Sequence, residues 1–90
     1  MNQEIKNQYR TATVNYLAQY EKKFPESTIN TIVNMLMYRD GHLPTCGHFV
    51  QAVIDNDLSA VLKADADNYA NLKEIIYAFK YCYLSEYLQQ

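Results

Sequence analysis

Glycine and proline are scarce in this sequence, and their scarcity limits the folds that it can adopt. Two glycines, two prolines and no tryptophan occur in 90 residues. A small all-β domain needs turn residues roughly every 8–12 positions to connect its short strands. Residues that favour turns are too few here for such a domain, so the composition favours helices.

Neither positive charge nor hydrophobicity is concentrated enough to indicate a nucleic-acid-binding or membrane protein. The formal net charge is −2; residues 1–40 carry five basic and four acidic side chains, and residues 41–90 carry three and six. Duplex-binding domains usually have a clustered basic face, and a membrane-spanning helix needs about 20 consecutive apolar residues. The sequence has neither feature, so we expect no direct nucleic-acid partner and no membrane span.

Cysteine is also infrequent, and its usage indicates a reducing compartment. Cys46 and Cys82 are the two cysteines, and the first ten residues, MNQEIKNQYR, contain no apolar signal-peptide region. Disulfides are rare in cytosolic proteins, so we expect reduced thiols in a cytoplasmic protein. Hydrophobic residues make up 49% of the chain and charged residues 20%, a balance typical of folded rather than disordered proteins.

Length and apolar spacing predict one all-α domain, residues 1–90, built as a compact bundle of four to five helices. The first helix is expected to cover residues 3–23, and the second to begin within residues 25–28 and end near Arg39. The second helix has the cleanest amphipathic pattern and should form the centre of the core. The predicted core positions are Ile5, Tyr9, Ala12, Tyr16, Leu17 and Tyr20 in the first helix, and Ile29, Ile32, Val33, Leu36 and Met37 in the second.

Residues 41–67 predict a connector made of two short helices. Gly41 suits the left-handed position just past a helix end, and Pro44 prevents the chain from continuing as helix. Side-chain oxygens can then cap the free N–H groups of each new helix. The expected caps are Thr45 for the first short helix, Asn56 and Asp57 for the second, and Asp65 and Asp67 for the last helix of the chain.

The last helix is expected to run unbroken from Asn68 to Leu88 and to carry two apolar stripes. Its 21 residues would span about 31 Å, comparable with the ~30 Å diameter of a domain of this length. One stripe provides a sufficient core face, and the second lies on a different arc of the helix. The core stripe is Leu72, Ile75, Ile76, Phe79 and Tyr83; the second is Tyr77, Tyr81, Leu84 and Leu88, bordered by Lys73 and Lys80.

The second stripe has two interpretations. Because a helix packed on one side of a small domain needs only one apolar face, a further stripe containing tyrosines indicates a protein-binding surface. Alternatively, the first helix folds over the stripe and buries it. We take the four residues of the stripe as candidate partner-binding residues, with Lys73 and Lys80 as the rim.

His42, Cys46 and His48 are weak candidate metal ligands, with Cys82 as a conceivable fourth. Imidazole and thiolate are zinc ligands, but the spacing H-x3-C-x-H is not that of a common zinc finger. Cys46 and His48 also have the chemistry of a nucleophile and its base, but no third orienting residue is identifiable. We therefore expect no metal, no cofactor and no enzymatic activity.

The segment from residue 42 to 72 resembles a pattern found in small uncharacterised helical proteins of tailed bacteriophages and prophages. In that pattern a Pro-x-x-Gly-x-Phe opening leads through Ala-Val and Asn-Asp-Leu to Ala-Asp and a final helix. The resemblance implies a phage origin and, because such proteins often bind a host protein, an anti-defence role. The matching residues are Pro44, Gly47, Phe49, Ala52, Val53, Asn56, Asp57, Leu58, Ala64 and Asp65.

The leading functional hypothesis is a non-catalytic protein-binding module acting in the cytoplasm of a bacterial host. It would inhibit or redirect a host protein, and an anti-CRISPR inhibitor is its most specific version. A second hypothesis is a homodimeric structural or accessory phage protein that uses the same stripe for a symmetric contact. A third is a small metal- or thiol-dependent protein centred on His42, Cys46 and His48.

Overall fold

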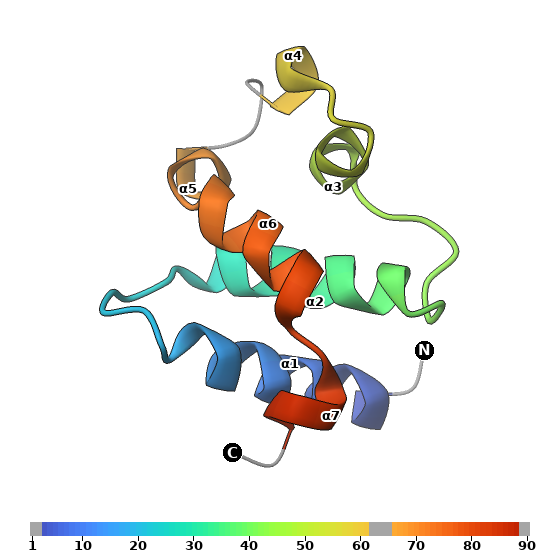
Figure 1. Ribbon diagram of the computed structural model, residues 1–90. Coiled ribbons are helices and arrows are strands. Elements are labelled where there is room, and N and C mark those ends of the chain that lie inside the picture. The colour runs from blue at the N-terminus through green and yellow to red at the C-terminus, as the bar shows by residue number, and fades with distance from the viewer. Residues whose placement is uncertain (1–2, 62–65, 89–90) are drawn as a thin grey trace.

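The computed structural model describes residues 3–61 and 66–88, and within those ranges it contains seven α-helices and no strand (Figure 1). This confirms the all-α prediction, although the helices are shorter and more numerous than the four to five that the sequence predicts. The helices are α1 (Gln3–Leu17), α2 (Glu26–Arg39), α3 (His48–Ile54), α4 (Leu58–Val61), α5 (Ala66–Ala70), α6 (Leu72–Tyr81) and α7 (Leu84–Tyr87).

α1 and α2 pack against each other along the faces that their apolar spacing predicts. On α1, Tyr9 and Tyr16 are each 3% exposed, and on α2, Ile32 and Leu36 are fully buried. A buried phenol needs a hydrogen-bond partner, and the Tyr16 hydroxyl lies 3.3 Å from another phenol, that of Tyr20. α2 also contacts α5 and α6, so it is the central helix of the fold.

α1 ends at Leu17, six residues before the predicted end at Lys23. The Tyr20 N–H bonds the Leu17 carbonyl, three residues back, at 3.0 Å, so the last turn tightens and the helix stops. The Tyr20 ring then makes edge contacts with the rings of Tyr16 and Phe24, each at a centroid distance of 6.0 Å. Aromatic packing around Tyr20 therefore replaces the last predicted turns of the helix.

Two local signals in the connector are confirmed. Gly41 has φ +87°, and the N–H groups of Gly41 and His42 bond the carbonyls of Tyr38 and Met37 at 3.1 and 2.8 Å. This hydrogen-bond pattern ends a helix with a left-handed residue, and glycine adopts that conformation without a Cβ clash. At α4, the Asp57 carboxylate accepts the Ala60 N–H at 3.2 Å, the expected N-cap bond.

The predicted cap at Thr45 is wrong. α3 begins at His48, and its N-cap is Gly47, which makes no side-chain cap hydrogen bond. Glycine is about as favourable as threonine at an N-cap, so the helix starts two residues later than its hydroxyl signal indicates. The predicted cap residue Asp65 and the side chain of Asp67 lie outside the described residues.

The predicted single C-terminal helix is also wrong, because the chain turns at two places. The first turn is at Asn71, which has φ −112° and ψ 21° and precedes the first residue of α6. Its side chain is 7% exposed, and its Nδ2 lies 3.5 Å from the Thr28 hydroxyl of α2. A polar side chain directed into the core therefore marks the junction of α5 and α6.

The second turn lies at Cys82 and Tyr83, whose backbones are extended, with ψ 103° and 140°. Beyond it, α7 lies against α1 (Figure 1). The Asn15 amide donates to the Tyr87 carbonyl at 2.7 Å, and the Tyr16 and Tyr87 rings meet edge-on at 5.2 Å. At this break, tertiary contacts with α1 outweigh the helical propensity of the segment.

The helices form stacked layers, with α1 and α7 on one side, α2 and α6 in the middle, and α3 and α4 on the other side (Figure 1). The radius of gyration is 12.4 Å and the extents are 36 × 33 × 20 Å. No helix within the described ranges is long and apolar enough to span a membrane. α6 lies between the outer layers, and it carries the candidate residues Tyr77 and Tyr81.

Candidate protein-binding surface

One face of α6 packs into the core. Ile75, Ala78 and Cys82 are fully buried, and they lie on one side of the helix at spacings of three and four residues. Burial raises the pKa of the Cys82 thiol to about 11, and its Sγ lies 3.7 Å from the Ala12 carbonyl oxygen. The helix therefore has all the internal packing that it needs on this side.

On another side, α6 exposes two aromatic rings. Tyr77 is 38% exposed and Tyr81 58%, and their rings meet edge-on with centroids 6.1 Å apart. The Lys73 ammonium lies 5.6 Å from the Tyr77 ring centroid, within the range of a cation–π contact, and Lys80 is exposed on the same helix. We call these four residues the tyrosine face.

The other two predicted partner-binding residues do not extend this face. Leu84 and Leu88 follow the extended break, outside α6, and each is half-buried. Leu84 packs against the core cluster, and α7 as a whole lies on α1. The tyrosines of the stripe are therefore exposed, whereas its leucine end folds back toward α1.

Arg39 fixes the end of α6 from the neighbouring helix α2. Its Nη1 donates to the Phe79 carbonyl at 2.9 Å, and its guanidinium stacks over the Tyr83 ring, with Cζ 4.3 Å from the centroid. Within an unbroken helix the Phe79 carbonyl would accept the N–H four residues on. Arg39 supplies a donor in its place and so satisfies a carbonyl that the break leaves without its helical partner.

Asp40 holds that guanidinium in position and connects it to α1. Arg39 donates through Nε and Nη2 to the two carboxylate oxygens of Asp40, at 2.7 and 3.1 Å, and the Tyr9 hydroxyl donates to the same carboxylate at 2.7 Å. The guanidinium holds the pKa of Asp40 below its usual range, although partial burial acts in the opposite direction. Burial and the bond to Asp40 raise the pKa of Tyr9 to about 12.

One further charged contact leaves α6 with a positive outer surface. Glu74 pairs with Lys22 at 2.8 Å. Burial, the largest single effect, disfavours the charge of Glu74, but the Lys22 hydrogen bond, a backbone hydrogen bond and the nearby lysine charges together lower its pKa. Within the described ranges, neither Lys73 nor Lys80 has a carboxylate at ion-pair distance. The outward charges of α6 are therefore those of its two lysines.

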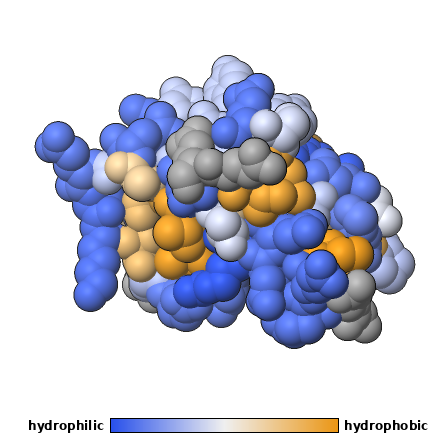
Figure 2. All heavy atoms as spheres, turned by 90° about the horizontal axis from the view of Figure 1, so that it is seen from below, coloured by the Kyte–Doolittle hydropathy of each residue, from blue (hydrophilic) through white to orange (hydrophobic). Residues whose placement is uncertain are grey.

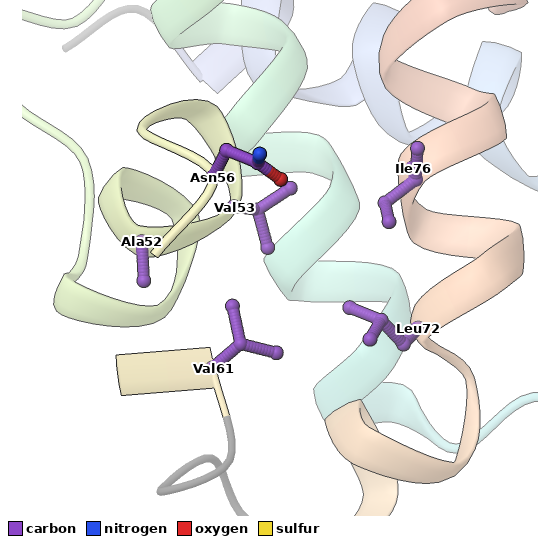
Figure 3. Close-up of a pocket in the computed structure, with 6 residues that line it drawn as sticks. All are labelled: Ala52, Val53, Asn56, Val61, Leu72 and Ile76. Carbon is purple, nitrogen blue, oxygen red and sulfur yellow. The ribbon is translucent and has the colours of Figure 1, made fainter. Parts of the chain in front are cut away.

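An apolar groove lies along another edge of α6, where α3 and α4 face it. It consists of two adjoining hollows of about 80 and 280 Å³ that share Val53, Asn56 and Ile76. Figure 3 shows side chains of α3, α4 and α6 directed into the space between these helices. We call this feature the α3–α6 groove; its remaining residues are Ala52, Val61 and Leu72 in the smaller hollow and Ile54, Phe79 and Lys80 in the larger.

The weak metal candidates do not gather around Cys82. His42 and His48 are exposed, and Cys46 is half-buried with its Sγ 3.4 Å from the Gln51 side-chain oxygen. Cys82 lies in the core instead, and both thiols are free. Across residues 3–61 and 66–88, no group of three or more histidine, cysteine, aspartate or glutamate side chains has an arrangement that would hold a metal ion.

Some of the site could not be identified from the sequence. Three residues are predicted as core and lie elsewhere at least in part: Ile76 and Phe79 are half-buried and line the groove, although Phe79 also packs against the core, and Tyr83 is 43% exposed beneath Arg39. Arg39 itself gave one usable signal, because a basic residue in the last turn of a helix is available to bond free carbonyls. The sequence does not show, however, that Arg39 bonds a carbonyl of α6 rather than one of its own helix, because this depends on how the two helices are placed.

No family model, no curated protein and no solved structure matches this chain.

Proposed function

We propose that this protein is a non-catalytic binding module that recognises another protein through the tyrosine face of α6. The protein is phage-encoded in this proposal and acts in the cytoplasm of a bacterial host, where it inhibits or redirects a host protein. An inhibitor of a bacterial defence system, of the anti-CRISPR type, is its most specific form. The phage origin rests on the sequence resemblance of residues 42–72, and the binding role rests on the structure of α6.

The observation that supports binding is the exposure of Tyr77 and Tyr81 on a helix whose core face is already complete. Tyrosine is enriched among residues that dominate protein interfaces, because it contributes a large rigid contact area together with a hydroxyl. The two rings already contact each other edge-on in the unbound protein. Such preorganisation lowers the entropy that is lost on binding.

The charges on this face indicate the chemistry of the partner. Lys73 and Lys80 are exposed, so a complementary surface carries carboxylates around an apolar centre that receives the tyrosine rings. The same lysines oppose a symmetric dimer through this face, since a two-fold axis would bring like charges together. The arrangement thus favours a foreign acidic protein over a second copy of the chain.

A capture experiment with matched variants tests the proposal. The Tyr77→Glu/Tyr81→Glu double variant introduces charge at both rings, and Tyr69→Glu is the control because Tyr69 is exposed (52%) on α5. We expect wild type and the control to retain a protein from bacterial lysate that the double variant loses. All three should keep the same helical content and melting temperature. Capture of the same proteins by all three baits would contradict the proposal.

Light scattering on a sizing column separates this proposal from the homodimer hypothesis. The proposal predicts the mass of one 10.5 kDa chain over a wide range of protein concentration. A stable species of twice that mass that dissociates in the Tyr77→Glu/Tyr81→Glu variant would instead show that the tyrosine face binds a second copy.

A further inference from the structure

The α3–α6 groove indicates what kind of structure the partner presents. Resting on the proposed function, we propose that this groove receives an amphipathic helix of the partner protein. The helix would place apolar side chains in the two hollows and carboxylates along the flank that meets α6. The groove and the tyrosine face lie on the two sides of the ridge formed by Lys73 and Lys80, so one partner can occupy both.

The dimensions of the groove match the side-chain spacing of a helix. Along α6 its lining runs from Leu72 to Lys80, a separation of eight positions and therefore about 12 Å. The two adjoining hollows provide successive positions for apolar side chains over that length. On a helix, residues four and seven positions apart on one face are separated by about 6 and 10 Å along the axis.

The walls of the groove exclude the other common ways of binding a peptide. Strand addition requires an exposed sheet edge with free backbone N–H and C=O groups, whereas these walls are formed mainly by helices α3, α4 and α6. Polyproline segments are recognised on aromatic-lined surfaces, and Phe79 is the single aromatic side chain among the residues that line the two hollows. Aliphatic walls suit the apolar side of a helix.

The charges on either side of the groove indicate which charges the two flanks of the bound helix carry. Lys73 and Lys80 stand on α6, whereas Asp55 and Asp57 are exposed where α3 turns into α4. Asp55 already accepts the Gln51 amide at 2.9 Å, and Asp57 accepts the Ala60 N–H at 3.2 Å. The complementary helix is therefore acidic on the flank facing α6 and neutral or basic on the flank facing α3 and α4.

A displayed library of helices tests this inference without knowledge of the natural partner. Its members share a helical framework and vary in their apolar ridge and flanking charges. We expect selection on the wild-type protein to enrich apolar residues at i and i+4, with carboxylates on one flank. Selected helices should bind the Ile76→Arg variant at least about tenfold more weakly. Selection on Lys73→Glu/Lys80→Glu should enrich helices with a basic flank in place of the acidic one.

Two further variants make the result interpretable. Ile54→Arg obstructs the opposite wall of the groove at a residue that is 36% exposed, so it tests the same contact if Ile76→Arg does not fold. Val14→Arg is the matched control, because Val14 lines a separate hollow of about 280 Å³ between α1 and α2. Binding should persist in the control. Figure 2 views the molecule from the side of α1 and α7, where patches of hydrophobic residues are separated by hydrophilic residues.

The inference is overturned if no helix is enriched, or if the enriched helices bind Ile76→Arg and Ile54→Arg as tightly as wild type. Loss of binding in Val14→Arg alone would place the site in the other hollow and would also overturn it. Failure of the proposed function is distinguishable, because lysate capture is then unaffected by the tyrosine substitutions while library helices still occupy the groove.

Discussion

The helices α1, α2, α6 and α7 are tied together by polar and aromatic contacts that link distant parts of the chain, whereas α3 and α4 mainly contact each other. Arg39 of α2 bonds the α6 backbone, Tyr9 of α1 bonds Asp40, and Asn15 of α1 bonds the α7 backbone. The α3–α4 unit contributes few buried side chains, such as Val50 and Ala52, and α3 does not pack closely against α6.

This contrast divides the molecule into two parts. Helices α1, α2, α6 and α7 are closely connected, and we call them the platform; the α3–α4 unit is connected to them more loosely. α6 belongs to the platform, so its tyrosine face is held in place by helices that pack beneath it, as a preorganised binding surface requires. The groove lies where the platform meets the α3–α4 unit, and segments with few buried contacts open at lower free energy than the core. In the proposed binding role, the tyrosine face is thus the preformed surface, and the α3–α4 side of the groove is the part that we expect to move on binding.

The largest effect is expected from truncating the centre of the platform. Leu36 is fully buried on α2, whereas Ile54 is 36% exposed on α3. Leu36→Ala should lower the free energy of unfolding by about 3 kcal/mol through lost burial and a residual cavity. Ile54→Ala should change it by less than about 1 kcal/mol. Chemical denaturation measures both, and similar losses would show that the two regions do not differ in packing.

A smaller effect is expected from removing the residue that fixes the break after α6. Arg39→Met keeps the aliphatic stem but removes the donor of the Phe79 carbonyl and the guanidinium that pairs with Asp40, whose carboxylate keeps the Tyr9 hydroxyl as a donor. We expect the free energy of unfolding to fall by about 2 kcal/mol. Relative to wild type, amide exchange should accelerate more in α7 than in α2. Unchanged exchange in α7 would show that Arg39 does not hold this end of the chain.

The pH dependence of the unfolding free energy should show that Asp40 stabilises the fold through its contact with Arg39. Its pKa is lower in the folded protein than its ordinary value of 3.8, so its charged form stabilises the fold. That contribution is complete above pH 3.8 and disappears as pH falls through the lower folded value. Asp40→Asn should reduce the slope of unfolding free energy against pH in this acidic range.

The coupling to the guanidinium provides the control for that experiment. In the Arg39→Met background the pKa of Asp40 loses its main lowering cause, so Asp40→Asn should then change the slope much less. An equal change of slope in both backgrounds would indicate that Asp40 acts independently of Arg39.

The sequence predicted best those features that depend on local spacing. Ile32 and Leu36 lie on the side of α2 that faces the core of the domain, because a helix with apolar residues at these intervals can bury only that side. The same argument predicted Tyr77 and Tyr81 as surplus to the core. The argument failed at Tyr83 and Leu84, because the helix ends where Arg39 donates a hydrogen bond to the Phe79 carbonyl. No local sequence signal marks that contact between α2 and α6. The α3–α6 groove depends on how two separate helices are placed, so periodicity cannot reveal it.

Site-specific photocrosslinking in bacterial cells tests the central claim most directly. A photoreactive phenylalanine analogue is placed at Tyr81, with the same analogue at Tyr69 as the exposed control on α5. The account predicts a covalent adduct of one defined mass from position Tyr81 and none from position Tyr69. The absence of an adduct at Tyr81, or the same adducts from both positions, would contradict the proposal that the tyrosine face of α6 binds a host protein.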